Sequence, residues 1–342
     1  MYPSVSIIVL NWNGKVVTRK CIDSILNSTV YHRDKLNLII VDNGSTDGSV
    51  FYLREAYKNV KINIDFIPLS YNCGFIKANN IAIKYAICKY NVDYIFLLNN
   101  DTEVIDENWL KDLIEIAESD ECIGIVGPKL IFPDGKIQWS GAKRDNNILS
   151  LIIQTITARR NPGFGKPEKI AKEANFVGDV NTISGASFLI KRKLIDKIGM
   201  LDLSLEPMFQ EDVEYCFRAW KFGYRVVYVG NVRLMHYEGY SVENTGNEND
   251  LIYLKHYWAL RNSIIVSLRY FGVLKTFLFG FPIFLFATFF DKKNKTEKLT
   301  WNNLKLRFSI QKSTILFFTA VKDALMRFQN ENTQCFKNSS RQ

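Results

Sequence analysis

The chain has 342 residues, of which 47% are hydrophobic and 23% are charged. This composition excludes a disordered chain and a fibrous repeat, and the length is sufficient for one large core or two modest ones. The net charge of +9 is unevenly distributed, because residues 255–342 carry 15 Lys and Arg against 4 Asp and Glu, whereas residues 1–254 carry 29 against 31. The basic excess therefore belongs to the last quarter of the chain.

The six cysteines are scattered singly without a CxxC pair, and the chain has only three histidines that could complete a zinc site with them. This pattern predicts a reduced, cytoplasmic setting. The first residues, MYPSVSIIVLNWNG, have no basic region and enter a strand-like run at once, so we expect no signal peptide.

Strand and helix patterns alternate over the first hundred residues, which predicts an α/β fold with a parallel sheet. Short aliphatic runs predict the strands, and apolar residues at helical spacing predict the helices. Neither GxGxxG nor GxxxxGK[ST] occurs, so a dinucleotide-binding or P-loop enzyme is disfavoured. The expected strands are residues 5–10, 38–41, 64–67 and 94–98, and the expected helices are residues 15–26, 48–57 and 77–89.

Polar residues follow each of these four strands, at the edge of the sheet where open α/β sheets bind ligands. Asp42 is placed to accept hydrogen bonds from a ribose hydroxyl or a base N–H. The alternative is that such residues only cap helices and shape turns, but their coincidence at four strand ends favours a ligand site. The residues concerned are Asn11, Asp42, Asn72, and the pair Asn100 and Asp101.

The stretch LLNNDTEV carries a buried strand directly into two amides and a carboxylate. A nucleotide diphosphate brings about two negative charges, and without a lysine-bearing phosphate loop a divalent cation, Mg²⁺ or Mn²⁺, would neutralise them. Asp101 could hold this cation, while Asn99 and Asn100 would add neutral donors and acceptors. The alternative interpretation is an ordinary turn after the strand.

The second half predicts a helix over residues 209–222 and a strand over residues 225–229. Glu211 and Asp212 lie in the first turn of that helix, either as simple partners of the helix dipole or as candidate catalytic acids. His236 follows the strand. It could be a satisfied core residue, or it could complete a divalent-metal site with Asp101.

The most apolar segment of the chain, residues 263–290, lies in the basic tail. Basic residues beside aromatic and aliphatic ones predict contact with an anionic membrane surface. Nucleic acid is disfavoured as a partner, because a Phe-rich run suits lipid better than a phosphate backbone. The segment is long enough to span a bilayer, but Arg269, Lys275 and Pro282 interrupt it, so an interfacial or re-entrant helix is favoured over a spanning one.

Six motifs in a fixed order carry a resemblance to a known family. The chain resembles the family 2 glycosyltransferases of GT-A fold, and it is most similar to their rhamnosyltransferase and galactofuranosyltransferase-like branch. The resemblance implies a Rossmann-like catalytic domain over residues 1–262, with a nucleotide-binding half at 1–105, an acceptor-binding half at 106–262 and a helical, membrane-associating tail at 263–342. The motifs are IIVLNWNG, VDNGSTDGSV, NCGFIKANN, LLNND, SGASFLIKR and FQEDVEYCFRAWKFGYR.

The resemblance further implies an inverting transfer of a sugar from a nucleotide-sugar donor to an acceptor hydroxyl. The expected acceptor is a lipid-linked glycan in cell-surface polysaccharide or glycoconjugate assembly, reached at the inner face of the cell membrane. By matching motifs, Asp212 is the general base with Glu211 as the alternative, and Asp101 and His236 are the metal ligands. The donor-binding residues implied in the same way are Asn11, Asp42, Asn72, Asn100 and Arg261.

Three positions depart from the family pattern. Asn99 replaces the first carboxylate of the metal-binding DxD, and Ile76 and Lys77 stand where the family has small residues. The QxxRW signature of processive synthases is absent, so we expect one or a few sugars to be added. Two hypotheses from other classes remain open at this point, a nucleotidyltransferase that makes the activated sugar and a non-catalytic membrane scaffold.

Overall fold

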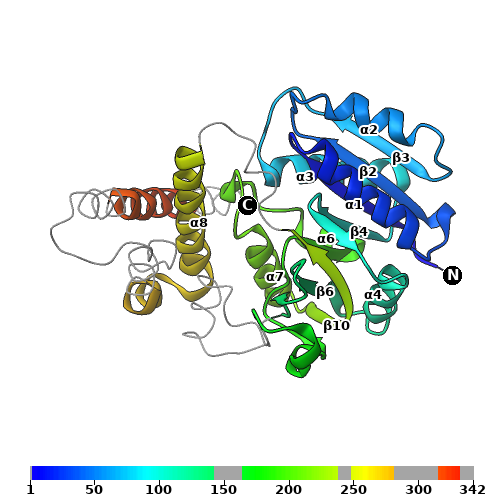
Figure 1. Cartoon of the computed structure of the whole chain (residues 1–342). Coiled ribbons are helices and arrows are strands. Elements are labelled where there is room, and N and C mark those ends of the chain that lie inside the picture. The colour runs from blue at the N-terminus through cyan, green and yellow to red at the C-terminus, as the bar shows by residue number, and fades with distance from the viewer. Residues whose placement is uncertain (1, 142–163, 238–247, 281–314, 332–342) are drawn as a thin grey trace, which may run out of the picture. The chain divides into compact units, whose positions relative to one another are not determined.

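The computed structural model describes residues 2–141, 164–237, 248–280 and 315–331 (Figure 1). The chain divides into two compact units, one made of residues 1–145 and 159–248 and the other of residues 146–158 and 249–342. The predicted boundary at residue 262 falls inside helix α8 (Glu248–Phe271). The division into domains with those bounds stays a prediction.

The first unit is built on a ten-stranded sheet with the order β3-β2-β1-β4-β9-β6-β10-β5, and β7 and β8 pair with β6 and β10. The first four strands in this order are parallel, as are β6 and β10, whereas β9 runs antiparallel to both β4 and β6. The predicted mostly parallel α/β sheet is confirmed. The strands are β1 (Val5–Asn11), β2 (Leu36–Asp42), β3 (Asn63–Pro68), β4 (Tyr94–Asn99), β5 (Thr102–Val104), β6 (Ile123–Ile131), β7 (Ile137–Trp139), β8 (Val177–Asp179), β9 (Ser187–Lys191) and β10 (Arg225–His236).

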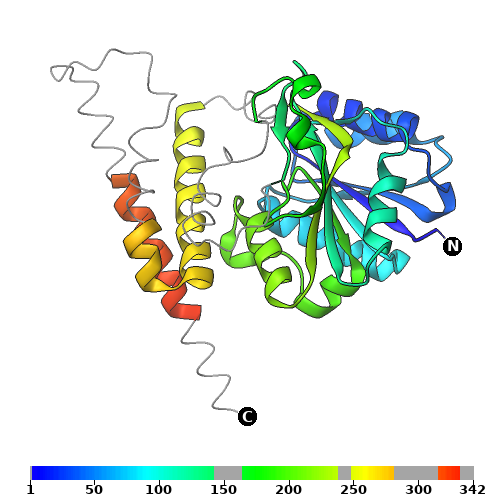
Figure 2. The same cartoon turned by 90° about the horizontal axis from the view of Figure 1, so that it is seen from below.

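Helices cover both faces of this sheet (Figures 1 and 2). Val5, Ile7 and Val9 belong to a core shared with α1, α2 and α4, and Ile8, which alternates with them along the strand, is buried on the opposite face. Helix α3 packs against β1 and β2. The helices of this unit are α1 (Lys15–Ser28), α2 (Ser49–Tyr57), α3 (Phe75–Tyr90), α4 (Trp109–Glu118), α6 (Arg192–Ile198) and α7 (Glu211–Lys221).

The elements expected in the first hundred residues are confirmed, with ends that shift by a few residues. The helix expected at residues 209–222 is shorter than predicted, because Phe209 and Gln210 have φ values of 75° and 67°, outside the helical region. The strand expected at residues 225–229 is longer, since β10 continues to His236. This extension brings His236 beside Thr102 of β5.

In the second unit, α8 is followed at Gly272 by the short helix α9 (Val273–Lys275) and a π-helical turn (Thr276–Gly280), and residues 315–331 form a further helix. The Tyr257 hydroxyl donates to Asp323, and Arg269 Nε donates to Glu331 over 2.9 Å. The partner nearer the start of α8 contacts the residue nearer the start of the other helix, and the later partner contacts the later residue, so the two helices run parallel. Residues 281–290 of the predicted membrane segment lie outside the described residues. Within the described ranges, every helix is too short or too polar to cross a bilayer.

Candidate active site

Three neighbouring parallel strands of the first unit end in polar residues at the same level of the sheet. Asn11 of β1 pairs in register with Asp42 of β2, and Leu10 pairs with Asn99 of β4. Parallel strands present their carboxyl ends at one edge. The expected convergence of these strand ends is therefore present.

Asn11 and Asp42 belong to a buried hydrogen-bond network, which we call the strand-end network. Asn11 Nδ2 donates to Asp42 Oδ2 over 2.7 Å, and the Thr18 hydroxyl donates to Asn11 Oδ1 over 2.7 Å. Asn100 Nδ2 in turn donates to the Thr18 hydroxyl over 2.9 Å. All of these side chains are buried, and that of Asn11 is 0% exposed. The network fixes the side chains in place, and contact of Asn11, Asp42 and Asn100 with a donor stays a prediction.

The loop that follows β3 is fastened to the end of β2. Asn43 Nδ2 donates to Asn72 Oδ1, and the Cys73 N–H donates to Asn43 Oδ1, each over 2.9 Å. Gly44 has a φ of 74°, and a Cβ there would lie 2.5 Å from the carbonyl carbon of Tyr71, so this close approach requires glycine. Asn72 is exposed at the edge of the sheet, so its side chain is accessible to a ligand. Its contact with the donor stays a prediction.

The same loop also contacts the segment that leads into α7. The Pro207 carbonyl accepts hydrogen bonds from the Phe75 and Ile76 N–H groups over 2.8 and 3.3 Å. These are the first N–H groups of α3, which has no side-chain cap, so a backbone carbonyl from the second half of the unit satisfies them. The start of α3 thus connects the loop after β3 with the segment that leads into α7.

Asp101 and His236, 135 residues apart in the chain, lie side by side. His236 Nε2 is 3.1 Å from Asp101 Oδ1, and His236 Nδ1 is 2.7 Å from Gln138 Oε1. Placing the proton on Nδ1, where the Gln138 amide oxygen would accept it, leaves Nε2 of a neutral imidazole with a lone pair towards the carboxylate. Two facing acceptors need a cation or a proton between them. This donor set fits a divalent cation.

The separation of 3.1 Å between the two atoms is compatible with a shared cation and equally with a direct hydrogen bond. Ligands at neighbouring corners of an octahedron with bonds of about 2.1 Å lie about 3.0 Å apart. Among the described residues, no group of three or more His, Cys, Asp or Glu side chains converges on one point. A cation at Asp101 and His236 would therefore need oxygens from water or from a bound diphosphate to complete its coordination.

Helix α7 presents the two candidate catalytic acids. Asp212 Oδ2 accepts the Gly185 N–H over 2.7 Å, and Oδ1 accepts the Val213 N–H over 2.8 Å. Burial raises the pKa of Asp212, although these two N–H groups oppose the rise. Asp212 is partly exposed, and backbone N–H groups orient both of its carboxylate oxygens.

Glu211 differs from its neighbour in its surroundings. Its side chain is 9% exposed, and Oε2 is enclosed without a hydrogen-bond partner in the described part of the chain. Burial, followed by the charge of Asp212, raises the pKa of Glu211 to about 8. At neutral pH Glu211 is therefore the neutral acid, which leaves Asp212 as the better proton acceptor of the two.

Arg261 lies in α8 and belongs to the second unit. Its guanidinium carbon is 5.6 Å from the centre of the Tyr257 ring, and its Nε donates to Asn262 Oδ1 over 2.9 Å. Burial lowers the pKa of Arg261. Its predicted place near the diphosphate stays a prediction.

Several residues of the site were not anticipated. Gln138, which orients His236, stands where the sequence carries no distinctive pattern, and Gly185, whose N–H holds Asp212, was not singled out for any role. Thr18 lies on the inner face of α1, and helical spacing alone would have placed it towards the sheet. Only the resemblance could have suggested Gly185, because it stands in the SGASFLIKR motif.

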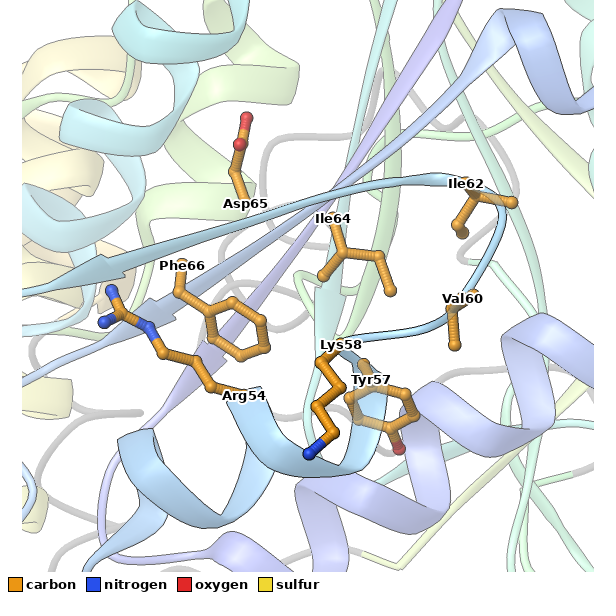
Figure 3. A pocket seen from close by; sticks show the side chains of 8 residues that line it. All are labelled: Arg54, Tyr57, Lys58, Val60, Ile62, Ile64, Asp65 and Phe66. Carbon is orange, nitrogen blue, oxygen red and sulfur yellow. The ribbon is translucent and has the colours of Figure 1, made fainter.

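A cavity of about 470 Å³ lies elsewhere on the first unit, beside the edge strand β3 (Figure 3). Ile64 and Phe66 line it on one side, and Arg54 and Lys58 lie at its α2 side. The Arg54 guanidinium carbon is 5.7 Å from the Phe66 ring centre. The cavity adjoins the amino-terminal half of β3, away from the strand ends described above, and it takes no part in the site.

Comparison with known proteins decides the family. Residues 6–199, more than half of the chain, match the family described as glycosyl transferase family 2. The chain belongs to glycosyl transferase family 2. The predicted family is confirmed, and with it the prediction of a glycosyltransferase domain. Family membership also favours this hypothesis over the nucleotidyltransferase and the scaffold.

Curated relatives and solved structures agree with this assignment. The O-antigen biosynthesis protein RfbC of Myxococcus xanthus is 29% identical over 246 residues, which are 70% of this chain and 18% of RfbC, and it loosely supports the predicted branch. The chain spans between 18% and 44% of the length of its curated relatives.

Two solved structures show the fold. TarS of S. aureus in complex with UDP-GlcNAc has a TM-score of 0.56 at 16% identity, covering 98% of this chain and 92% of that one. The mannosyltransferase PcManGT of Pyrobaculum calidifontis, in complex with GDP-Man and Mn²⁺, has a TM-score of 0.54 at 15% identity, covering 98% of this chain and 81% of that one. The predicted GT-A fold is confirmed.

Proposed function

We propose that this protein transfers a sugar from a nucleotide-sugar donor to an acceptor hydroxyl, with inversion at the anomeric carbon. The observation that carries the proposal is the facing pair of Asp101 and His236 at the carboxyl edge of a family 2 sheet, since two adjacent acceptor atoms are suited to a cation that binds a diphosphate. PcManGT with GDP-Man and Mn²⁺, and TarS with UDP-GlcNAc, support a donor of this class.

The strand-end network would hold the donor-binding side chains in fixed orientations. Asp42 keeps a fixed orientation through Asn11 and the Ser45 N–H, which donates to Asp42 Oδ1 over 2.8 Å. Each carboxylate oxygen can accept a second hydrogen bond, so Asp42 could receive one from the nucleoside. Asn72 and Asn100 are the further donor contacts we propose, and Arg261 is proposed to lie near the diphosphate.

Asp101 and His236 would hold a divalent cation, Mg²⁺ or Mn²⁺. When bound, the cation would neutralise charge on the diphosphate leaving group. Gln138 keeps the protonated Nδ1 of His236 engaged, so Nε2 remains the ligand atom. Because Asn99 replaces a carboxylate, we expect an affinity in about the micromolar to millimolar range, apparent when the nucleotide adds its own oxygens.

Asp212 would take the proton from the attacking hydroxyl. The Gly185 N–H fixes its carboxylate, and burial moves its pKa upward, towards the range in which a general base works at neutral pH. In-line attack from the side opposite the leaving diphosphate gives inversion. We propose that the acceptor is a lipid-linked glycan, that one or a few sugars are added, and that the reaction takes place at the inner face of the cell membrane.

The proposal is tested by screening the purified protein against UDP-, GDP-, dTDP- and CDP-sugars by thermal shift, with manganese and with chelator. We expect stabilisation by one nucleotide class in the presence of manganese, and slow release of the free nucleotide by donor hydrolysis. A protein that binds none of these donors and hydrolyses none would refute the proposed activity.

A further inference from the structure

The helix formed by residues 315–331 carries apolar side chains on two opposite faces. One face is buried within the second unit, and it consists of Leu316, Phe317, Ala320, Val321 and Ala324. The other, which we call the outer stripe, consists of Ile315, Phe318, Lys322 and Met326. The three apolar members of the outer stripe are 55%, 59% and 44% exposed, respectively.

The spacing shows that the outer stripe is a single surface. Its members lie at i, i+3, i+7 and i+11, which at about 100° per residue confines them to an arc of about 80°. The buried residues are centred on the opposite side of the same helix. A helix that has already buried one apolar face has no need of a second for its own packing.

The two acids of this helix lie towards α8. Asp323 accepts from the Tyr257 hydroxyl and Glu331 pairs with Arg269, so both acids are engaged by α8. Lys322 is exposed in the middle of the outer stripe. A lysine among apolar side chains can extend its ammonium to phosphate groups while its stem stays in contact with the apolar layer.

The structure also reduces the part of the predicted membrane segment, residues 263–290, whose side chains are accessible to lipid. Residues 264–268 form the first part of the predicted segment, yet Ile264, Ile265, Val266 and Leu268 are buried within α8. Beyond α8, Leu274 and Leu278 are 72% and 59% exposed, and Lys275 lies between them. Exposed apolar side chains beside lysine thus recur at a second place in this unit.

We propose that the outer stripe of residues 315–331 is a docking surface for an anionic lipid bilayer, which the helix contacts by lying along it. The basic excess of residues 255–342, 15 Lys and Arg against 4 Asp and Glu, complements a negatively charged surface. A second copy of the chain would bring the same positive charge to the contact, which disfavours a dimer through this surface. This inference rests on the proposed function, for which it names the membrane contact. Binding to vesicles is measured without a donor, so it is tested separately from sugar transfer.

The test is sedimentation of the full chain with vesicles of phosphatidylcholine, alone or mixed with phosphatidylglycerol. We expect binding to the mixed vesicles that weakens as salt is added, because charge attraction contributes. A triple variant, Ile315→Ser with Phe318→Ser and Met326→Ser, should bind about tenfold more weakly or worse, since each replacement removes apolar area. Phe51→Ser is the matched control, as Phe51 is 76% exposed on α2 of the first unit, and it should bind as the unmodified chain does.

A second variant tests the charge without touching the apolar side chains. Lys322→Glu should weaken binding to the mixed vesicles and flatten its dependence on salt. Circular dichroism and donor binding should be unchanged in every variant, which separates a failure of docking from a failure of the proposed transfer. Three results would overturn the inference: no sedimentation of the unmodified chain with anionic vesicles, equal sedimentation of the triple variant, or a dimer of the unmodified chain that the triple variant dissociates while vesicle binding persists.

Discussion

Two groups of polar side chains belong to the candidate active site, and they differ in how completely their hydrogen bonds are satisfied. In the strand-end network, Asn11 donates to Asp42 and accepts from Thr18, each over 2.7 Å. In α7, Asp212 is held by backbone N–H groups, but Glu211 has a carboxyl oxygen enclosed without a partner. A satisfied network contributes to stability and geometry, whereas an unsatisfied carboxyl costs stability and shifts its pKa. The first group serves as a scaffold, and the second is where proton transfer is proposed.

The largest effect is expected at Asp212. Asp212→Asn keeps the shape and removes the proton acceptor, so transfer should fall by about two to four orders of magnitude while donor binding survives. Turnover numbers and donor titrations on the same preparation measure both. Unimpaired turnover would move the base assignment to Glu211.

The next largest effect is expected at the facing pair. Asp101→Ala and His236→Ala should each weaken manganese-dependent donor binding by about tenfold or more. If the two side chains share one cation, the double variant should lose less than the sum of the single losses. Calorimetry on the four proteins measures this coupling, and simple additivity would argue for two unrelated structural roles.

Breaking the strand-end network should instead affect stability. Asn11→Ala removes the donor to Asp42 and the acceptor for Thr18, so urea unfolding should show a loss of about 1 to 3 kcal/mol. Asn63→Ala is the control, because Asn63 is exposed and donates a single bond to Asn37. Equal stability of Asn11→Ala and the unmodified chain would contradict a scaffold role.

The most specific effect is expected at Glu211, because it depends on pH. Its pKa is about 8 in the folded chain and near the usual 4.5 when unfolded, so between these values only the folded state holds the proton, and stability falls as pH rises. Glu211→Gln removes this dependence. Its free energy of unfolding relative to the unmodified chain should increase from pH 5 to about pH 8 and then level off. The exposed Glu121→Gln should show no such trend, and a flat difference for Glu211→Gln would refute the burial argument.

The sequence predicted the elements of the first hundred residues well, because β1, β2 and β4 are short apolar runs and α1 to α3 have clear helical spacing. It did not predict β9, which inserts antiparallel between β4 and β6, since a short stretch such as SFLIK carries no information about its partners. Likewise, the ends of β1 and β2 could be placed at one edge of the sheet from the sequence. The strand pattern does not reveal, however, that the Asn11 side chain is fully buried. The approach of Asp101 to His236 depends on β5 and β10 pairing, which the sequence did not predict, although a metal site shared by the two residues was one of the two roles considered for His236.

Titration of the donor selected by thermal shift into the unmodified protein, with manganese and then with excess chelator, tests the proposed metal-dependent transfer directly. We expect binding to depend on manganese, because Asp101 and His236 would hold the cation that contacts the diphosphate. Donor binding of equal strength in manganese and in chelator would contradict it.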